Sequence, residues 1–99
     1  MLEIKKTIEN GKATFLLSGR LDTGTSPDLD RELKASLDGI SELIIDLKKT
    51  DYISSAGLRV LLSAQKVMNR QGSMVIRNAN DTVMEIFEVT GFSDILTIE

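Results

Sequence analysis

The sequence predicts an α/β fold, in which a mixed β-sheet has helices covering one face in the order β-β-α-β-α-β-α. Two observations carry this prediction. The chain opens with two alternating segments around Asn10-Gly11, a hairpin signal. Short apolar runs then alternate with longer segments at helical spacing, which is typical of parallel strands joined by helices. At 99 residues we expect one domain over residues 1–99, with room for one modest core.

The first two strands are predicted from alternation. Leu2 to Lys5 alternates with the strand period, and the lysines that follow suit an edge strand. Lys12 to Ser18 is the return strand, and it carries apolar residues on both faces. We therefore expect this second strand to lie inside the sheet, with both faces at least partly covered.

The next segment predicts a loop, a helix and a central strand. Gly19 to Thr25 is polar and flanked by glycine, which indicates an exposed loop. Ser26 is expected to cap a helix whose first residue is Pro27, and that helix ends near Gly39. Glu42 to Leu47 contains the apolar run Leu43-Ile44-Ile45 and is expected to be a buried parallel strand. Lys48 to Tyr52 is expected to lead the chain off the sheet.

The rest of the chain predicts two more helices and a further strand. The second helix begins at Ser54 or Ser55, ends at Gln71-Gly72, and precedes a buried strand around Met74 to Ile76. Asn80-Asp81-Thr82 caps a third helix that Gly91 stops, and Ile95 to Ile98 can add a short terminal strand. The residues expected to face inward on the third helix are Val83, Ile86, Phe87 and Thr90.

Composition excludes several classes of function. The net charge is −3 with no extended basic patch, which argues against direct binding of nucleic acid or of an anionic membrane. The chain has no cysteine and no histidine, so the usual zinc ligands, a thiolate and the usual general base are missing. We therefore expect no metal site, no cofactor and no enzymatic activity, and the cytoplasm is the default location.

Ser54 and Ser55 are the strongest candidates for chemistry. A serine before a helix is usually an N-cap, and spacing alone favours that interpretation. One hydroxyl is enough for the cap, however, so the second is left over, and a helix start would stabilise a phosphate placed on it. A hydrolytic serine nucleophile is poorly supported because no histidine can activate it.

Gly57 and Asp22 have simpler interpretations. Gly57 lies on the apolar face of the second helix, so its missing side chain is expected to let that helix approach the sheet closely. Asp22 is expected to be a solvated turn acid.

Two motifs together resemble a known family. LSGRLDTGTSPDL matches a Leu-x-Gly-x-Leu-Asp loop at Leu17, Gly19, Leu21 and Asp22. LIIDLKKTDYISSAGLRVLL matches a strand, a loop and a helix start at Ser55, Ala56, Gly57 and Leu58. With this pair of motifs the chain resembles, over nearly its whole length, a STAS domain of the anti-sigma factor antagonist class.

The resemblance implies a bacterial partner-switching protein. The unphosphorylated form would bind an anti-sigma factor, often a serine kinase of the histidine-kinase-like ATPase fold, and so free the sigma factor. That kinase would phosphorylate the serine at the helix start, and a PP2C-type phosphatase would restore the protein. Aligned on Gly57-Leu58, the phosphoserine of the family falls on Ser55; Ser54, where many members carry Asp, is the second choice.

The resemblance also implies a docking surface that joins the Gly19–Thr25 loop to the Ser54–Leu58 helix start. The residues expected to bind the partner are Gly19, Leu21, Asp22, Thr23, Thr25, Ser54, Ser55, Ala56, Gly57 and Leu58. Two alternatives stay open at this point. One is a STAS module of a transporter-associated or stressosome-like complex, in which Ser55 is never modified. The other is a small hydrolase acting through Ser55.

Overall fold

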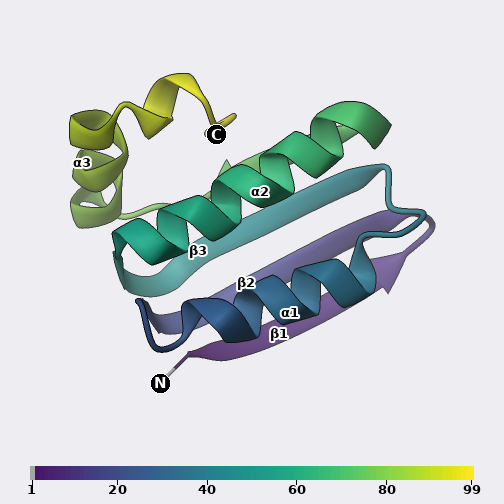
Figure 1. Cartoon of the computed structure of the whole chain (residues 1–99), viewed down its shortest axis with the longest axis horizontal. Coiled ribbons are helices and arrows are strands. Elements are labelled where there is room, and N and C mark those ends of the chain that lie inside the picture. The colour runs from purple at the N-terminus through teal and green to yellow at the C-terminus, as the bar shows by residue number, and fades with distance from the viewer. Residues whose placement is uncertain (1) are drawn as a thin grey trace.

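In the computed structural model, which describes residues 2–99, the strands form one mixed sheet of four strands in the order β1-β2-β3-β4 (Figure 1). β1 and β2 are antiparallel, whereas β2, β3 and β4 are parallel. The strands are β1 (Glu3–Glu9), β2 (Lys12–Leu21), β3 (Glu42–Ile53) and β4 (Ser73–Arg77). The helices are α1 (Ser26–Ser36), α2 (Ser55–Gln71) and α3 (Asp81–Thr90), followed by a short 3₁₀ helix, Phe92–Asp94. The predicted order of elements is therefore confirmed.

The β1–β2 hairpin closes as its sequence predicts. Asn10 has a φ of 51° and Gly11 a φ of 78°, as a two-residue hairpin turn of type I′ requires at both positions. The register that follows places Ile4, Lys6 and Ile8 opposite Leu17, Phe15 and Ala13. Of these three β1 residues only Ile4 is partly buried, whereas Lys6 and Ile8 are exposed.

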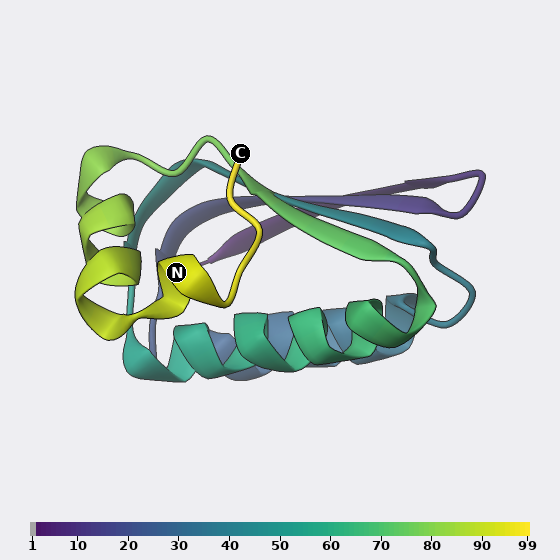
Figure 2. The ribbon, with the colours of Figure 1, turned by 90° about the horizontal axis from the view of Figure 1, so that it is seen from above.

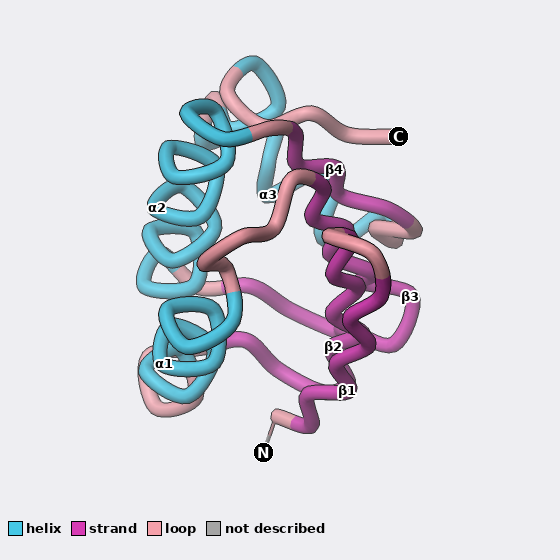
Figure 3. The backbone as a smooth tube through the Cα atoms, turned by 90° about the vertical axis from the view of Figure 1, so that its right-hand side faces the viewer, coloured by secondary structure: helices cyan, strands magenta, loops and turns pink. Residues whose placement is uncertain are grey.

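The molecule has two layers, a sheet and a pair of helices, and a third helix lies at one end. Helices α1 and α2 lie side by side on one face of the sheet, and α3 stands at the end where α2 begins (Figures 2 and 3). The core lies between the two layers. It contains Phe15, Leu17 and Leu21 from β2, Leu43, Ile45 and Leu47 from β3, and Leu29, Leu33, Leu61 and Met68 from the helices.

The opposite face of the sheet is only partly covered. Leu16 alternates along β2 with the buried Phe15 and Leu17, so it faces this side of the sheet, and it is half-buried. Ile44 of β3 is nevertheless only 3% exposed. Its register partners Thr14 and Val75 flank it on the neighbouring strands.

The predicted ends of β2 and β3 are wrong. Both strands continue past the positions where polar residues suggested loops, β2 through Leu21 and β3 through Ile53. Two register shifts in the β2–β3 ladder accommodate the extra residues of β3, as β-bulges do. Thr50 is buried there, and its hydroxyl donates a 2.9 Å hydrogen bond to the Leu17 carbonyl. Lys48 to Tyr52 is therefore strand, although its composition resembles that of a turn.

Three smaller predictions also need correction. The residue at the N-cap of α1 is Thr25, whereas Ser26 is buried inside the helix and its hydroxyl donates to the Asp22 carbonyl. Thr90 is exposed, and its hydroxyl bonds to the Ile86 carbonyl of its own helix. The terminal strand is reduced to one bridge between Ile76 and Ile98, because the preceding residues form the 3₁₀ helix.

Gly57 brings α2 against the ends of β2 and β3. A Cβ atom on this residue would lie 2.7 Å from Leu21 Cγ, 2.9 Å from the Leu21 carbonyl oxygen and 3.1 Å from Ile53 Cγ2. The carbonyl belongs to a paired strand and cannot move without disturbing the ladder. The structural role predicted for Gly57 is confirmed.

We expect Gly57→Ala to lower the free energy of unfolding by about 1–3 kcal/mol, the usual cost of overpacking. Helix propensity alone would favour alanine there by up to about 1 kcal/mol, so a net loss identifies the close approach as its cause. Gly24→Ala is the matched control, since its Cβ would meet only Asp22 Oδ1 at 3.6 Å. Denaturant unfolding measures both, and a Gly57→Ala protein as stable as the wild type would contradict this packing.

Candidate functional site

The two motif segments meet at the carboxyl ends of β2 and β3. Leu21 and Ile53 are register partners, and the next residue, Ser54, donates its backbone N–H to the Leu21 carbonyl over 2.8 Å. In Figure 1 the starts of α1 and α2 lie at this same end of the sheet. The expected adjacency of the Gly19–Thr25 and Ser54–Leu58 segments is confirmed.

The structure gives the two serines different roles. Ser54 is the N-cap of α2, with extended backbone, and its Oγ accepts a 3.3 Å hydrogen bond from the Gly57 N–H. Ser55 is the first residue of the helix, and it is exposed. The cap therefore occupies the hydroxyl of Ser54 and leaves the hydroxyl of Ser55 at the surface.

Asp22 holds the loop between β2 and α1 together. Its Oδ1 accepts from the backbone N–H groups of Gly24 and Thr25, both at 3.0 Å, and lies 3.1 Å from the Thr25 hydroxyl. The bond from the Thr25 N–H is the main cause that holds the pKa of Asp22 below its ordinary value, and partial desolvation opposes it. Asp22 is thus a partly exposed turn acid, as predicted, and its carboxylate also organises the loop.

The exposed Arg20 and the half-buried Tyr52 form a pair that sequence reasoning missed. They are register partners across β2 and β3, and the Arg20 guanidinium lies 4.5 Å from the centroid of the tyrosine ring. Arg20 Nε also lies 3.8 Å from Asp22 Oδ2. The two residues are distant in the sequence, so their pairing could have been predicted only if β3 had been extended as far as Tyr52.

Some residues predicted to bind a partner are inside the core. Leu21 is fully buried, Leu58 is 4% exposed, and Gly57 faces Leu21 and Ile53, so these three support the surface from below. Gly19 has a φ of 109° next to a register shift, a backbone conformation that favours glycine. The predicted binding residues that remain at least partly accessible are Gly19, Asp22, Thr23, Thr25, Ser54, Ser55 and Ala56.

Asn80 connects α3 to the same end of the sheet. Its Oδ1 caps α3 by accepting from the Val83 N–H at 2.8 Å, while its Nδ2 donates to the Thr50 carbonyl at 3.1 Å. The cap was predicted from the sequence, but the bond to β3 was not. Because Thr50 in turn bonds to Leu17, one short network ties α3, β3 and β2 together beneath the candidate surface.

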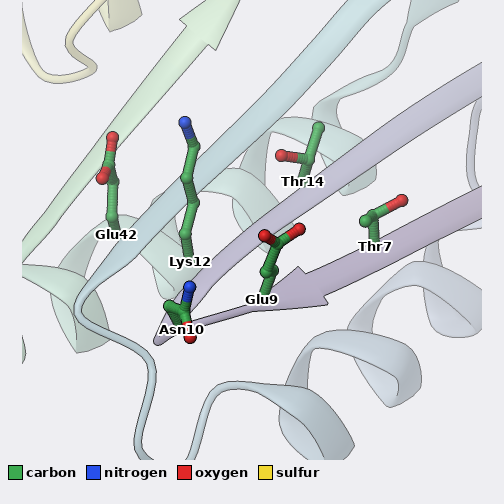
Figure 4. A pocket seen from close by; sticks show the side chains of 6 residues that line it. All are labelled: Thr7, Glu9, Asn10, Lys12, Thr14 and Glu42. Atoms are coloured by element: carbon green, nitrogen blue, oxygen red, sulfur yellow. The ribbon is translucent and has the colours of Figure 1, made fainter.

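A hollow of about 470 Å³ lies elsewhere. It is open, and it sits on the uncovered face at the hairpin end of the sheet (Figure 4). Its lining side chains are Thr7, Glu9, Asn10, Lys12, Thr14 and Glu42. Within residues 2–99, no group of three or more acidic side chains is placed to hold a metal ion, and no helix is long and apolar enough to cross a membrane.

Comparison with known proteins decides the family. A family model for the STAS domain matches residues 3–99. The chain belongs to the STAS domain family. It is 37% identical to BtrV of Bordetella bronchiseptica, a proposed anti-sigma factor antagonist, over 90% of this chain and 78% of that protein. It is 33% identical to the anti-sigma-B factor antagonist of Listeria monocytogenes, over 99% of this chain and 87% of that protein.

Solved structures share the STAS fold at lower identity. An anti-sigma factor antagonist from Mycobacterium paratuberculosis has a TM-score of 0.89 at 19% identity, over 99% of this chain and 85% of that one. SpoIIAA has a TM-score of 0.76 in its unphosphorylated form and 0.75 in its phosphorylated form, each at 13% identity. These alignments cover 100% of this chain and 87% and 91% of those chains. The likeness is thus nearly the same to both forms of that protein.

The role of Asp22 in the loop predicts a pH-dependent contribution to stability. We expect the wild type to be more stable than Asp22→Asn at neutral pH. Because folding lowers the pKa of Asp22, this advantage is fully present above the ordinary value near ~4 and is lost as the pH falls through the lowered value. Denaturant unfolding at several pH values measures it.

Asp22→Ala separates charge from hydrogen bonding, since it removes the acceptor as well and should be less stable than the wild type throughout the range. A stability difference between wild type and Asp22→Asn that does not change with pH would show that the carboxylate charge contributes nothing to the loop.

Proposed function

We propose that the protein is a bacterial anti-sigma factor antagonist that acts by partner switching and is turned off by phosphorylation of Ser55. The observation that carries this proposal is the division of roles at the start of α2. Ser54 supplies the cap, and Ser55 presents an exposed hydroxyl at the joined ends of β2 and β3. The relatives above 30% identity include the anti-sigma-B factor antagonist of Listeria monocytogenes, which supports the same role.

The partner would be an anti-sigma factor that is also a serine kinase of the histidine-kinase-like ATPase fold. It would dock on the accessible surface that joins the Asp22–Thr25 loop to the Ser54–Ala56 helix start. Binding of the unphosphorylated protein would release the sigma factor. Transfer of phosphate from ATP to the Ser55 hydroxyl would end binding, and a PP2C-type phosphatase would hydrolyse the phosphate and restore the protein.

The position of Ser55 decides how a phosphate would act. At the first residue of a helix, a phosphate meets the positive end of the helix dipole, which favours the helix by roughly 0.3–1 kcal/mol. The phosphate would therefore stabilise α2, and we do not expect the helix to melt. At a docking surface the same dianion must lose its water, which costs on the order of several kcal/mol unless a cation of the partner matches it. The proposed switch is therefore local and leaves the fold intact.

The same residues argue against the other two interpretations. A hydrolase acting through Ser55 would need a base, and the sequence has no histidine. A transporter-associated module would not require a spare hydroxyl beside the cap. The proposed role is thus regulatory, with no cofactor, no direct nucleic-acid contact and no membrane contact.

We expect Ser55 to be the phosphate acceptor. Incubation of the wild type with a cognate kinase and ATP should add one phosphate, and fragment-ion mass spectrometry should place it on Ser55. Ser55→Ala should abolish modification but keep binding to the unloaded kinase, because it removes only an exposed hydroxyl.

Ser54→Asp is the informative control, since aspartate preserves an N-cap acceptor while removing the second hydroxyl. This variant should fold and should still be modified. Phosphate found on Ser54 in the wild type, together with continued modification of Ser55→Ala, would contradict the assignment.

A further inference from the structure

Arg59 lies one helical turn after Ser55, and both residues are exposed on α2. We propose that Arg59 binds the phosphate of phosphorylated Ser55. The inference rests on the proposed function, because it concerns the modified state of that same serine. It adds a residue that lies outside the set predicted to bind a partner and gives it a role in the phosphorylated protein.

Helix geometry places the two side chains together. Residues four apart lie on the same face of an α-helix, one above the other, and Cα–Cβ bonds tilt toward the N-terminus. A long side chain at position 59 can therefore reach back over the first turn, toward Ser55. An anion one turn N-terminal to a cation is also the more favourable of the two orders.

Arg59 is free to make this contact. The ion pairs among residues 2–99 use Lys6, Arg20, Arg31, Lys34 and Arg77, and none of them uses Arg59. Arg20, the other arginine near the site, is already engaged by Asp22 and by the ring of Tyr52. Asp51, near the same end of β3, is exposed and acidic.

The chemistry of arginine suits this role. Its planar guanidinium offers two parallel N–H groups to a phosphate, whereas lysine offers a point charge. Before modification, the surface beside Ser55 carries an exposed cation. After modification, the phosphate would pair with that cation and make the local charge more negative. A partner that is complementary to the first state would be less complementary to the second.

The test uses full-length protein with phosphoserine inserted at position 55 during synthesis, so that no kinase is needed. Phosphorus-31 NMR follows the second ionisation of the phosphate as the pH is raised. Arg59→Gln should raise that pKa by roughly 0.2–0.4, the value that corresponds to an exposed pair one turn apart. Arg59→Lys should raise it less, and added salt should reduce the difference.

Two further variants identify the cation. Arg70→Gln removes an exposed arginine from the last turn of the same helix and should leave the pKa unchanged. Arg20→Gln tests the other arginine near the site. An unchanged pKa in Arg59→Gln would overturn the proposal, and so would a shift in Arg20→Gln that equals or exceeds the shift in Arg59→Gln.

This experiment separates the inference from the proposed function. Because the phosphate is introduced without a kinase, an unchanged pKa would reject Arg59 as its partner and leave phosphorylation of Ser55 standing. Failure of a cognate kinase to modify Ser55 would reject the proposed function, whatever the pKa of the inserted phosphate.

Discussion

The pairing of the bulged ends of β2 and β3 is the constraint on which the site depends. It sets Leu21 beside Ile53 and leaves the Leu21 carbonyl to accept the Ser54 N–H. That bond fixes where α2 begins, and Gly57 then lets the first turn of the helix lie against Leu21. Without this end of the ladder, the loop at Asp22 and the serine pair would have no fixed relation to each other.

A surface built in this way is formed before any partner arrives. Ser54, Asp22 and Asn80 each satisfy backbone groups at the start of a helix or in the loop that precedes one. Such bonds hold the surface in one arrangement and reduce the ordering that binding would otherwise require. A switch built on this surface can therefore work through charge alone, since a single added phosphate changes the chemistry of the surface and leaves the scaffold in place.

The sequence predicted those features that depend on local patterns. The hairpin at Asn10-Gly11, the start of α2 and the close approach at Gly57 all follow from short-range signals, and the structure confirms them. The resemblance to the STAS family was also correct, because two specific motifs carried it.

The errors arise where a distant residue decides the local structure. Thr50 belongs to a strand because its hydroxyl reaches Leu17 and its carbonyl reaches Asn80. Ser26 looks like a cap, but the folded loop turns its hydroxyl toward the Asp22 carbonyl, and the N-cap position falls on Thr25. Leu21 and Leu58 match the family motif as packing residues, since both lie in the core. Pattern and propensity contain none of these tertiary contacts.

The most direct test of this account compares the protein phosphorylated on Ser55 with the unmodified protein. Thermal unfolding followed by circular dichroism and the affinity for the cognate anti-sigma factor are measured on the same samples. A local switch predicts that the phosphorylated protein keeps its helical signal and melts no lower, while its affinity falls about a hundredfold or more. A melting temperature lower by many degrees after phosphorylation would contradict the account, because it would show that the switch works by unfolding.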